Sequence, residues 1–397
     1  MKNLGVVLGV CVIGAGLVGA QPKPADKRAE PAAVVADAAL AERIVTKTAN
    51  VKEGDIVEIA TGPQDLAFAE ELAVAVRNHG AHPVITFWSE SLTKKMATTP
   101  AKYDAQSPAA GLMLAKAVNV RIVLPAVRDE SLGALLAPER RAALGKASMS
   151  VGELRRKRGI RIVELGNGMA PSPARAALTG LSEAQQTKMF WDGITADYAS
   201  IEEKGKALKA TLAAGNELRI TLPNGTDLKM KVKARKVLVS DGVISDADVK
   251  AGGPNVQVWL PAGEVYLVPV PGTAEGKLVD DRMTFDGKEL TGVTAELKAG
   301  KITSVTAKTG WDVVKPLYDA AGAGKNELSI VDFGINPSVK ATPKFENYVA
   351  AGTVMIATGD NTWAGGNVKE PFSLQFFLSG ATVTLDGKPI VDAGTLK

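Results

Sequence analysis

A chain of 397 residues is longer than one hydrophobic core usually organises, so two domains of ordinary size are expected. Hydrophobic residues make up 46% and charged residues 23%, which excludes a disordered chain, and a net charge of +4 gives no indication of a nucleic-acid partner. One cysteine and two histidines exclude a disulfide-stapled scaffold and a thiolate metal centre.

The amino-terminal segment is typical of a secretory signal peptide. Residues 1–20 contain one lysine, then an apolar run, then small residues at a cleavage point, and a polar spacer follows over residues 21–34. The apolar run is too short to prefer crossing a bilayer, so no stable membrane span is expected after cleavage, and a retained anchor is the alternative. Cys11 lies inside this run. The pattern therefore predicts an exported protein, periplasmic or extracellular, whose mature chain has no cysteine.

Alternating strand and helix signals in the first half predict a doubly wound parallel α/β layer. Short β-branched runs are separated by segments with apolar residues at helical spacing. Strands joined through helices pair in parallel, so one N-terminal domain is expected over residues 35–210. The expected elements, in chain order, are helix 35–49, strand 56–60, helix 64–79, strand 83–88, helix 109–118, strand VRIVLPA and strand 160–166.

The second half has a different pattern. A helical segment over residues 183–214 is followed by ELRITLPNGTDLKMKV, in which an Asn-Gly turn lies between alternating residues and indicates a hairpin. Short strands and glycine-containing turns continue to the end of the chain. We therefore expect a β-rich C-terminal domain over residues 211–397.

Several common catalytic and binding patterns are missing. The chain has no Gly-x-Ser-x-Gly elbow and no glycine-rich phosphate loop between a strand and a helix. Its two histidines, His79 and His82, flank the end of a helix and favour a structural role over a metal pair. The basic run at residues 155–158 is interpreted as a solvated helix end, and no nucleic-acid partner is expected.

Three blocks in the second half hold acidic residues at strand ends and turns. WLPAGEVYLVP places Glu264 just before a strand, SIVDFGINPSVK contains Asp332, and AGTVMIATGDN contains Asp360 in the turn after a short strand. The ends of strands in such folds are where ligands and catalytic groups often lie, yet the central side chain of the third block is Met355.

With these blocks in place, the chain resembles the aminopeptidase T family of thermophilic-type metallo-aminopeptidases over nearly the whole mature length. VKEGDIVEIA, GAHPVITF, MFWDGITADYASI and LPNGTDL are similar to its first and middle regions, and PAGEVYLVPVPGTAEGKLV is the most specific match. The resemblance implies the family's fold and a site of two divalent metal ions, such as zinc or cobalt, that cleaves amino-terminal residues from peptides.

The resemblance implies a ligand at Glu264, where the family has its first metal-binding glutamate. The second glutamate position is Ile330 here, and the histidine of the Gly-Thr-x-His block is Met355. Asp332 follows Ile330 by two residues, so in an extended strand it lies on the same side and could partly substitute. A thioether is a soft ligand that suits neither hydrolytic zinc nor cobalt, and an isoleucine has no ligand atom.

The family's His-x-Asp pair aligns with Ser373 and Gln375, so neither of those ligands is kept. Asp360 is a possible substitute, and a hard oxygen site for calcium, magnesium or manganese could also include Glu346. We expect Ile330, Met355 and Phe376 to make the former metal pocket apolar.

Three hypotheses follow. The first is an exported relative that is inactive or chemically diverged, needs no cofactor and binds a peptide or small molecule in the old cleft. The second is an active aminopeptidase with a rearranged carboxylate site of Glu264, Asp332 and Asp360, holding zinc, cobalt, manganese or magnesium. The third is an envelope-associated scaffold, and a homodimer is possible because members of the family tend to pair.

Overall fold

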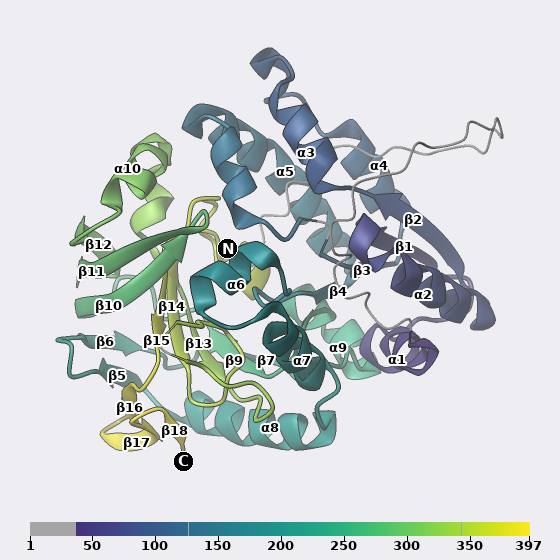
Figure 1. Ribbon diagram of the computed structural model, residues 1–397. Helices are drawn as coiled ribbons and strands as arrows, with labels where there is room; N and C mark the ends of the chain where they lie inside the picture. The colour runs from purple at the N-terminus through teal and green to yellow at the C-terminus, as the bar shows by residue number, and fades with distance from the viewer. Residues whose placement is uncertain (1–36, 126, 343) are drawn as a thin grey trace.

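The computed structural model describes residues 37–397 except residues 126 and 343. The signal peptide and the spacer expected over residues 1–34 lie outside the described residues. Within the described part of the chain, no helix is both long and apolar enough to cross a membrane. The chain forms three sheets with helices around the first of them (Figure 1).

The first sheet is parallel, as the sequence predicts, with strand order β2-β1-β3-β4-β8. The third strand ends at Val123, before the last three residues of the predicted run VRIVLPA, because Pro125 in that run has no backbone N–H to donate. The fifth strand comes from beyond residue 210. The strands are β1 Ile56–Thr61, β2 His82–Phe87, β3 Val120–Val123, β4 Arg161–Leu165 and β8 Gln257–Leu260.

The helices lie mainly in the first half of the chain. The segment expected to be helical over residues 183–214 is two helices, and each begins at a side-chain cap, Ser182 for α7 and Asp197 for α8. The helices are α1 Ala38–Arg43, α2 Leu66–Asn78, α3 Glu90–Ala97, α4 Ala109–Ala117, α5 Pro138–Arg158, α6 Pro173–Thr179, α7 Glu183–Ile194, α8 Tyr198–Ala214, α9 Asp246–Ala251 and α10 Trp311–Ala320. Short helical turns are η1 Ile44–Thr48, η2 Pro63–Asp65, η3 Ala101–Tyr103, η4 Glu130–Leu135, η5 Gly253–Val256, η6 Ala323–Asn326 and η7 Thr362–Ala364.

Two antiparallel sheets form the second half, as expected for a β-rich part. We call the outer one sheet B, with order β12-β11-β10-β6-β5-β16-β17-β18, and the inner one sheet C, with order β15-β14-β13-β9-β7. The predicted Asn-Gly hairpin joins β5 and β6, and Gly225 has a φ of +100° in its turn. Sheet B consists of β5 Glu217–Thr221, β6 Asp227–Lys231, β10 Glu275–Phe285, β11 Lys288–Lys298, β12 Lys301–Thr306, β16 Thr382–Leu385, β17 Lys388–Asp392 and β18 Thr395–Leu396. Sheet C consists of β7 Val237–Ser240, β9 Glu264–Leu267, β13 Leu328–Gly334, β14 Val354–Thr358 and β15 Gln375–Leu378.

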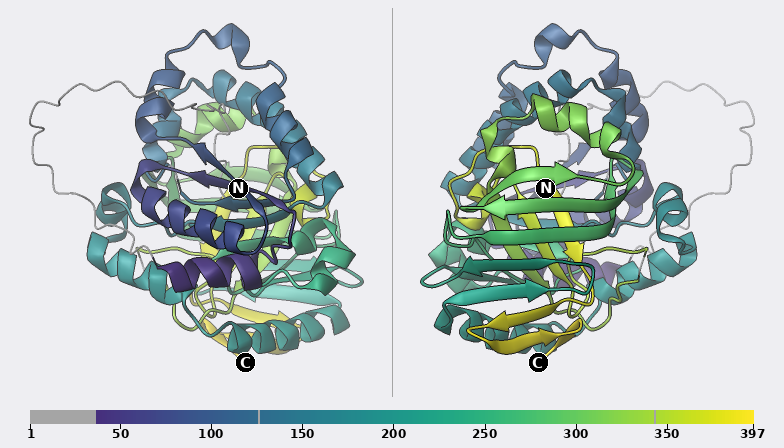
Figure 2. Two further views of the ribbon diagram at one scale, coloured as in Figure 1. Left: turned by 90° about the vertical axis from the view of Figure 1, so that its right-hand side faces the viewer. Right: turned by 90° about the vertical axis from the view of Figure 1, so that its left-hand side faces the viewer.

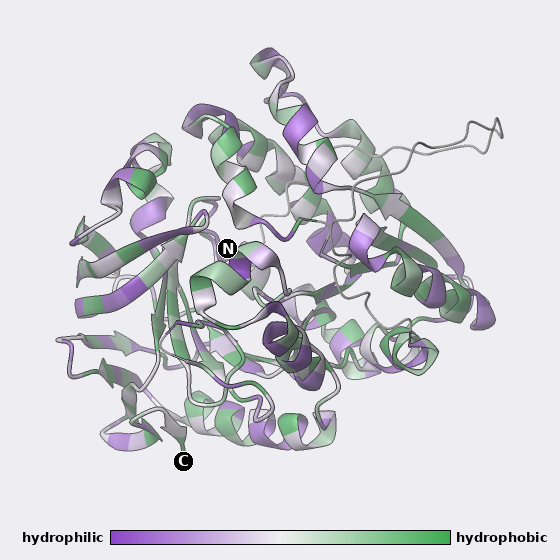
Figure 3. Ribbon diagram, viewed as in Figure 1, coloured by the Kyte–Doolittle hydropathy of each residue, from purple (hydrophilic) through white to green (hydrophobic). Residues whose placement is uncertain are grey.

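Sheet C is buried on both faces. Figure 2 shows sheet B on one side of it and the helical half of the molecule on the other. Alternate residues of its strands therefore enter two different cores. Tyr266, Ile330 and Met355 belong to the core shared with the parallel sheet, while Val265, Val331 and Ile356 belong to the core shared with sheet B. In Figure 3, green, the colour of hydrophobic residues, recurs along these central strands.

The basic run at the end of α5 agrees only in part with its interpretation as a solvated helix end, since Lys157 and Arg158 are exposed but Arg155 is not. Arg155 is buried, 3.8 Å from Glu58, and burial lowers its pKa to about 9. Arg158 donates hydrogen bonds of 2.8 Å to the carbonyls of Ala115 and Val118. These two arginines therefore connect α5 to its neighbours, Arg155 from a buried position and Arg158 through hydrogen bonds made at the surface.

Candidate functional site

The candidate site lies on the face of sheet C that packs against the parallel sheet. Strand register sets its side chains in two rows across the sheet. The Met355 row contains Phe377, Met355, Asp332, Tyr266 and Leu238, and the Ile330 row contains Gln375, Ala357 and Ile330. Asp332 and Ile330 share one face, as expected from their spacing. Glu264 joins them because it is two residues from Tyr266 on β9.

Glu264 is held by the segment that follows β4. The Asn167 side-chain nitrogen donates to Glu264 Oε1 at 2.8 Å and to the Pro261 carbonyl at 2.9 Å. Glu264 is 0% exposed and Asn167 is 2% exposed. Since β4 and β8 both end here, this carboxylate lies at the carboxyl ends of parallel strands, where open α/β sheets usually bind ligands.

Asp332 lies between two large side chains. Tyr266 is directly opposite it on β9 and Met355 is directly opposite it on β14, and Asp332 itself is 1% exposed. Met355 is also 1% exposed, so it fills this part of the interior. A flexible, polarizable methionine packs well in such an irregular space.

The two remaining degenerate positions differ in their roles. The Gln375 side-chain oxygen accepts a 2.6 Å hydrogen bond from the Tyr348 hydroxyl, and Gln375 is therefore part of the site. The Ser373 hydroxyl donates instead to the neighbouring Leu374 carbonyl at 3.4 Å, a weak local contact.

Asp360 does not join Glu264 and Asp332. Its Oδ1 accepts hydrogen bonds from Thr362, at 3.1 Å from the backbone nitrogen and 2.7 Å from the hydroxyl, so it closes the turn that begins η7. Among the described residues, no group of three or more histidines, cysteines, aspartates or glutamates could hold a metal ion. The expected gathering of the three carboxylates is not what the structure shows.

Phe376 was expected to line this pocket, and that expectation is wrong. Its side chain belongs to the core shared with sheet B, while Phe377 is the neighbour of Met355 on the site face. Successive strand residues point to opposite faces, so an error of one position moves the whole side chain across the sheet.

The site combines buried acids with buried phenols. Burial raises the pKa of Tyr266 well above its usual range, and the nearby charges of Glu264 and Asp332 raise it further. The pKa of Tyr348 is raised by the same causes, against which the Gln375 hydrogen bond and Arg175 act. Both hydroxyls therefore stay protonated at neutral pH and can donate hydrogen bonds.

One basic side chain lies near the phenols. Arg175, on α6, is close enough to Tyr348 for its charge to act against the rise in the pKa of that phenol, and burial lowers the pKa of Arg175 to about 10. Arg175, Asn167 and Tyr348 come from three segments that the sequence did not single out. The one available signal was the Asn-Gly pair immediately after the predicted strand 160–166, a usual place for a ligand-contacting turn.

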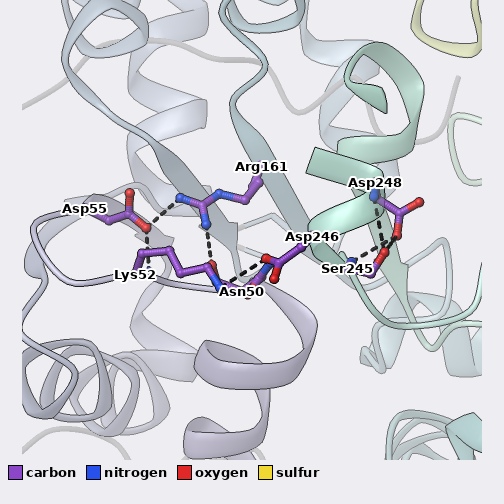
Figure 4. Close-up of polar contacts among 7 residues, drawn as sticks. All are labelled: Asn50, Lys52, Asp55, Arg161, Ser245, Asp246 and Asp248. Carbon is purple, nitrogen blue, oxygen red and sulfur yellow. Dashed lines mark hydrogen bonds and ion pairs between the residues drawn. The ribbon is translucent and has the colours of Figure 1, made fainter. Parts of the chain in front are cut away.

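A separate pocket of about 220 Å³ lies at the opposite, amino-terminal ends of β3 and β4. Three of its polar residues, Lys52, Arg161 and Asp246, already contact one another or the adjacent Asn50 and Asp55 (Figure 4). Lys52 Nζ is 3.1 Å from Asp246 Oδ1, and an Arg161 terminal nitrogen is 2.5 Å from Asp55 Oδ2. The Asn50 side chain donates to Asp246 at 2.8 Å. This network ties α9 to the loop before β1, which is a structural role.

Glu346, which could have joined an oxygen site, lies instead with Asp280 of β10. Asp280 accepts hydrogen bonds from the backbone nitrogens of Arg282 at 3.0 Å and Phe377 at 3.2 Å. Burial raises the pKa of Asp280 to about 7, and burial followed by the charge of Asp280 raises the pKa of Glu346 to about 8. Two neighbouring carboxyl groups thus resist ionisation together.

This pair predicts a fall in stability as pH rises. Both carboxyl groups hold protons in the folded chain at pH values where the unfolded chain has lost them, so the free energy of unfolding decreases from about pH 4 to about pH 8. The slope is at most about 1.4 kcal/mol per pH unit for each proton. Thermal unfolding measured from pH 5 to 8.5 is expected to show a steady loss. The Glu346→Gln variant should flatten the profile of stability against pH, whereas Glu296→Gln, an exposed control on β11, should not. Equal slopes in wild type and both variants would contradict the assignment of this pH dependence to Asp280 and Glu346.

Comparison with known proteins places the chain in a family. The family model for thermophilic metalloproteases (M29) matches residues 38–338. No curated protein matches the chain. Wild-type AmpT from Thermus thermophilus has the same fold at a TM-score of 0.68 and 20% identity, covering 90% of this chain and 98% of that one. A 2,5-dihydroxypyridine dioxygenase from Pseudomonas putida is similar at a TM-score of 0.57 and 15% identity, covering 91% and 96%. The resemblance read from the sequence is therefore confirmed, and the chain belongs to the thermophilic metalloprotease family M29.

Proposed function

We propose that this chain is an exported member of the M29 family that does not assemble a two-metal centre, has lost or changed the family's peptidase activity, and binds a peptide or small molecule at the site face of sheet C. The fold alone does not decide the activity. One solved structure with a similar fold is that of a dioxygenase, so this architecture is compatible with more than one chemistry.

The observation that carries the proposal is the set of donor atoms on the site face. A hydrolytic pair of zinc or cobalt ions is usually held by imidazoles together with several carboxylates. Here the candidate positions provide two carboxylates, Glu264 and Asp332, while Ile330 and Met355 provide a hydrocarbon and a thioether. The residues present therefore do not fit the family's metal pair.

Hydrogen bonds within the site support a polar, metal-free arrangement. The Asn167 amide donates to Glu264, and the Tyr348 hydroxyl donates to Gln375. These bonds give Glu264 Oε1 and the Gln375 side-chain oxygen partners within the protein. A mostly apolar site with a few fixed polar groups is typical of ligand pockets.

Metal analysis of the purified mature protein tests the proposal. After separate incubation with zinc, cobalt and manganese, we expect less than stoichiometric metal by elemental analysis and no release of amino acids from peptides. Glu264→Ala serves as the matched variant. Stoichiometric metal together with peptide cleavage, both lost in Glu264→Ala, would establish the alternative of an active enzyme with a rearranged carboxylate site.

Pairing of two chains is a further part of the proposal. Size-exclusion chromatography with light scattering is expected to give a homodimer, and a monomer would remove this part without affecting the binding site.

A further inference from the structure

β2 is an edge strand of the parallel sheet. In the order β2-β1-β3-β4-β8 it pairs with β1 alone among the described strands, and it lies at the margin of the molecule in Figure 1. The backbone nitrogens of His82 and Trp88 donate hydrogen bonds toward β1, at 2.8 and 3.0 Å. Peptide groups of a parallel strand alternate between its two sides, so those of Pro83, Ile85 and Phe87 point outward.

The outward side of β2 is poorly protected against pairing with another strand. Natural edge strands are shielded by charged side chains, by bulges or by a covering segment. Residues 83–88, PVITFW, contain no charge, only Pro83 lacks an N–H donor, and Ile85 and Phe87 are each 41% exposed. α2 covers the face of the sheet to which these two side chains belong, and its Val74 is 57% exposed. Outward peptide groups thus coincide with exposed apolar side chains.

Charges on α2 favour a second copy of the chain in the opposite orientation. Because α2 joins two parallel strands, it runs antiparallel to β2. Glu70 and Glu71 lie in its first half, toward the carboxyl end of β2, and the exposed Arg77 lies in its last turn, toward the start of β2. A two-fold axis beside β2 brings the acidic half of each α2 next to the basic end of the other. A two-fold interface requires such self-complementarity.

We propose that β2 is the dimer interface of this protein, where it pairs antiparallel with β2 of a second copy so that the two parallel sheets join. This inference rests on the proposed function only for the pairing of two chains, to which it assigns a surface.

The outward peptide groups determine the register of the pair. A two-fold axis through Thr86 places Ile85 of each copy opposite Phe87 of the other, and each of these two pairs exchanges both N–H···O=C bonds. The same pairs bring apolar side chains together on the α2 face. An axis through Ile85 would instead place Phe87 opposite Pro83, which has no N–H to donate. We therefore expect the axis at Thr86.

Disulfide crosslinking tests the interface and its register. The two Thr86 residues are directly opposite in a non-hydrogen-bonded pair, with Cα atoms about 4.5 Å apart, which a disulfide can span. The mature chain expected after cleavage has no cysteine, so Thr86→Cys introduces a single thiol. We expect most of this variant to form a covalent dimer on mild oxidation, detected on a non-reducing gel.

Val84→Cys is the matched control on the same face of β2. In this register Val84 lies opposite Trp88 of the second copy, so the two new thiols are too far apart to join. Equal crosslinking by both variants, or none by Thr86→Cys, would overturn the inference.

A charge on the edge should separate the two copies. Ile85→Lys places two lysines as diagonal neighbours on one face of the joined sheet, and we expect the dissociation constant of the dimer to rise about tenfold or more. Light scattering after size exclusion, over a range of protein concentrations, measures this change. Val249→Lys on α9 is the control, because Val249 is also 41% exposed. Circular dichroism checks that both variants are folded, and equal dimerisation by the two would overturn the inference.

The oligomeric state of wild type separates this inference from the proposed function. A dimer that Ile85→Lys does not weaken and Thr86→Cys does not crosslink would keep the pairing of two chains and overturn this interface. A monomer at every concentration would remove both the pairing and the interface, and would leave β2 to a strand of a different protein. Neither result affects the proposed metal-free site, which the metal analysis tests.

Discussion

A variant that carries Ile330→Glu, Met355→His, Ser373→His and Gln375→Asp together is expected to gain zinc binding, whereas Met355→His alone is expected to gain none. The reason lies in the register of sheet C. Ile330 and Gln375 are both neighbours of Ala357 in one row, and the Met355 row is adjacent to it, so these three positions share one face. Three of the new ligands would join Glu264 on this face, and a histidine at residue 373 lies two positions before Gln375, whereas a single imidazole at residue 355 would still lack partners.

Thermal unfolding with and without zinc measures this effect. Zinc that binds only the folded chain stabilises it by about 2.7 kcal/mol when its concentration is about 100 times the dissociation constant. We expect that stabilisation in the fourfold variant and not in wild type or Met355→His. Adding Glu264→Gln to the fourfold variant should reduce it, because this removes the one ligand position that the family resemblance says is kept. Stoichiometric zinc uptake by Met355→His would show that the site is described wrongly.

The sequence predicted the framework of the fold well because the relevant signals are local. The runs at residues 56–60, 83–88 and 160–166 are strands of the parallel sheet, and the Asn-Gly turn joins a hairpin. Strand propensity, helical spacing and turn chemistry act within a few residues, so one chain is enough to detect them. The fifth parallel strand, β8, was not recognised, because its four residues join the sheet only through tertiary pairing.

The candidate site was less accessible to prediction. Spacing could place Asp332 on the same side of its strand as Ile330, and the register of β13 with β14 has them so. The family resemblance pointed to Glu264 and Met355 as ligand positions. Asn167 reaches Glu264 across 97 positions of sequence and Tyr348 reaches Gln375 across 27, and no local pattern encodes such contacts. Successive residues of a strand face opposite sides of the sheet, so an error of one position is enough to assign a side chain to the wrong face. This is what happened with Phe376.

The second large effect is expected at Gly352, which lies just before the strand that carries Met355. Gly352→Ala should lower the free energy of unfolding by about 3 kcal/mol or more, because two penalties add. The residue has a φ of +90°, a region that costs an L-residue about 1–2 kcal/mol. A Cβ atom there would also overlap the Gly394 carbonyl oxygen, and overpacking typically costs about 1–3 kcal/mol more.

The clash cannot be relieved by a side-chain movement, since the obstructing atom belongs to the backbone just before β18. Gly352 also donates its backbone N–H to the Gly334 carbonyl at 3.0 Å, so a shift away from Gly394 would strain the pairing of β13 with β14. Gly380→Ala separates the two penalties, because Gly380 has a φ of +78° but an added methyl group would meet no heavy atom within 4 Å. Urea unfolding should therefore show a loss of about 1 kcal/mol for Gly380→Ala and a clearly larger one for Gly352→Ala. Equal losses of stability in the two variants would mean that β14 can move away from the carboxyl-terminal strands. The pairing of Met355 with Asp332 would then not depend on the close approach of Gly352 to the Gly394 carbonyl.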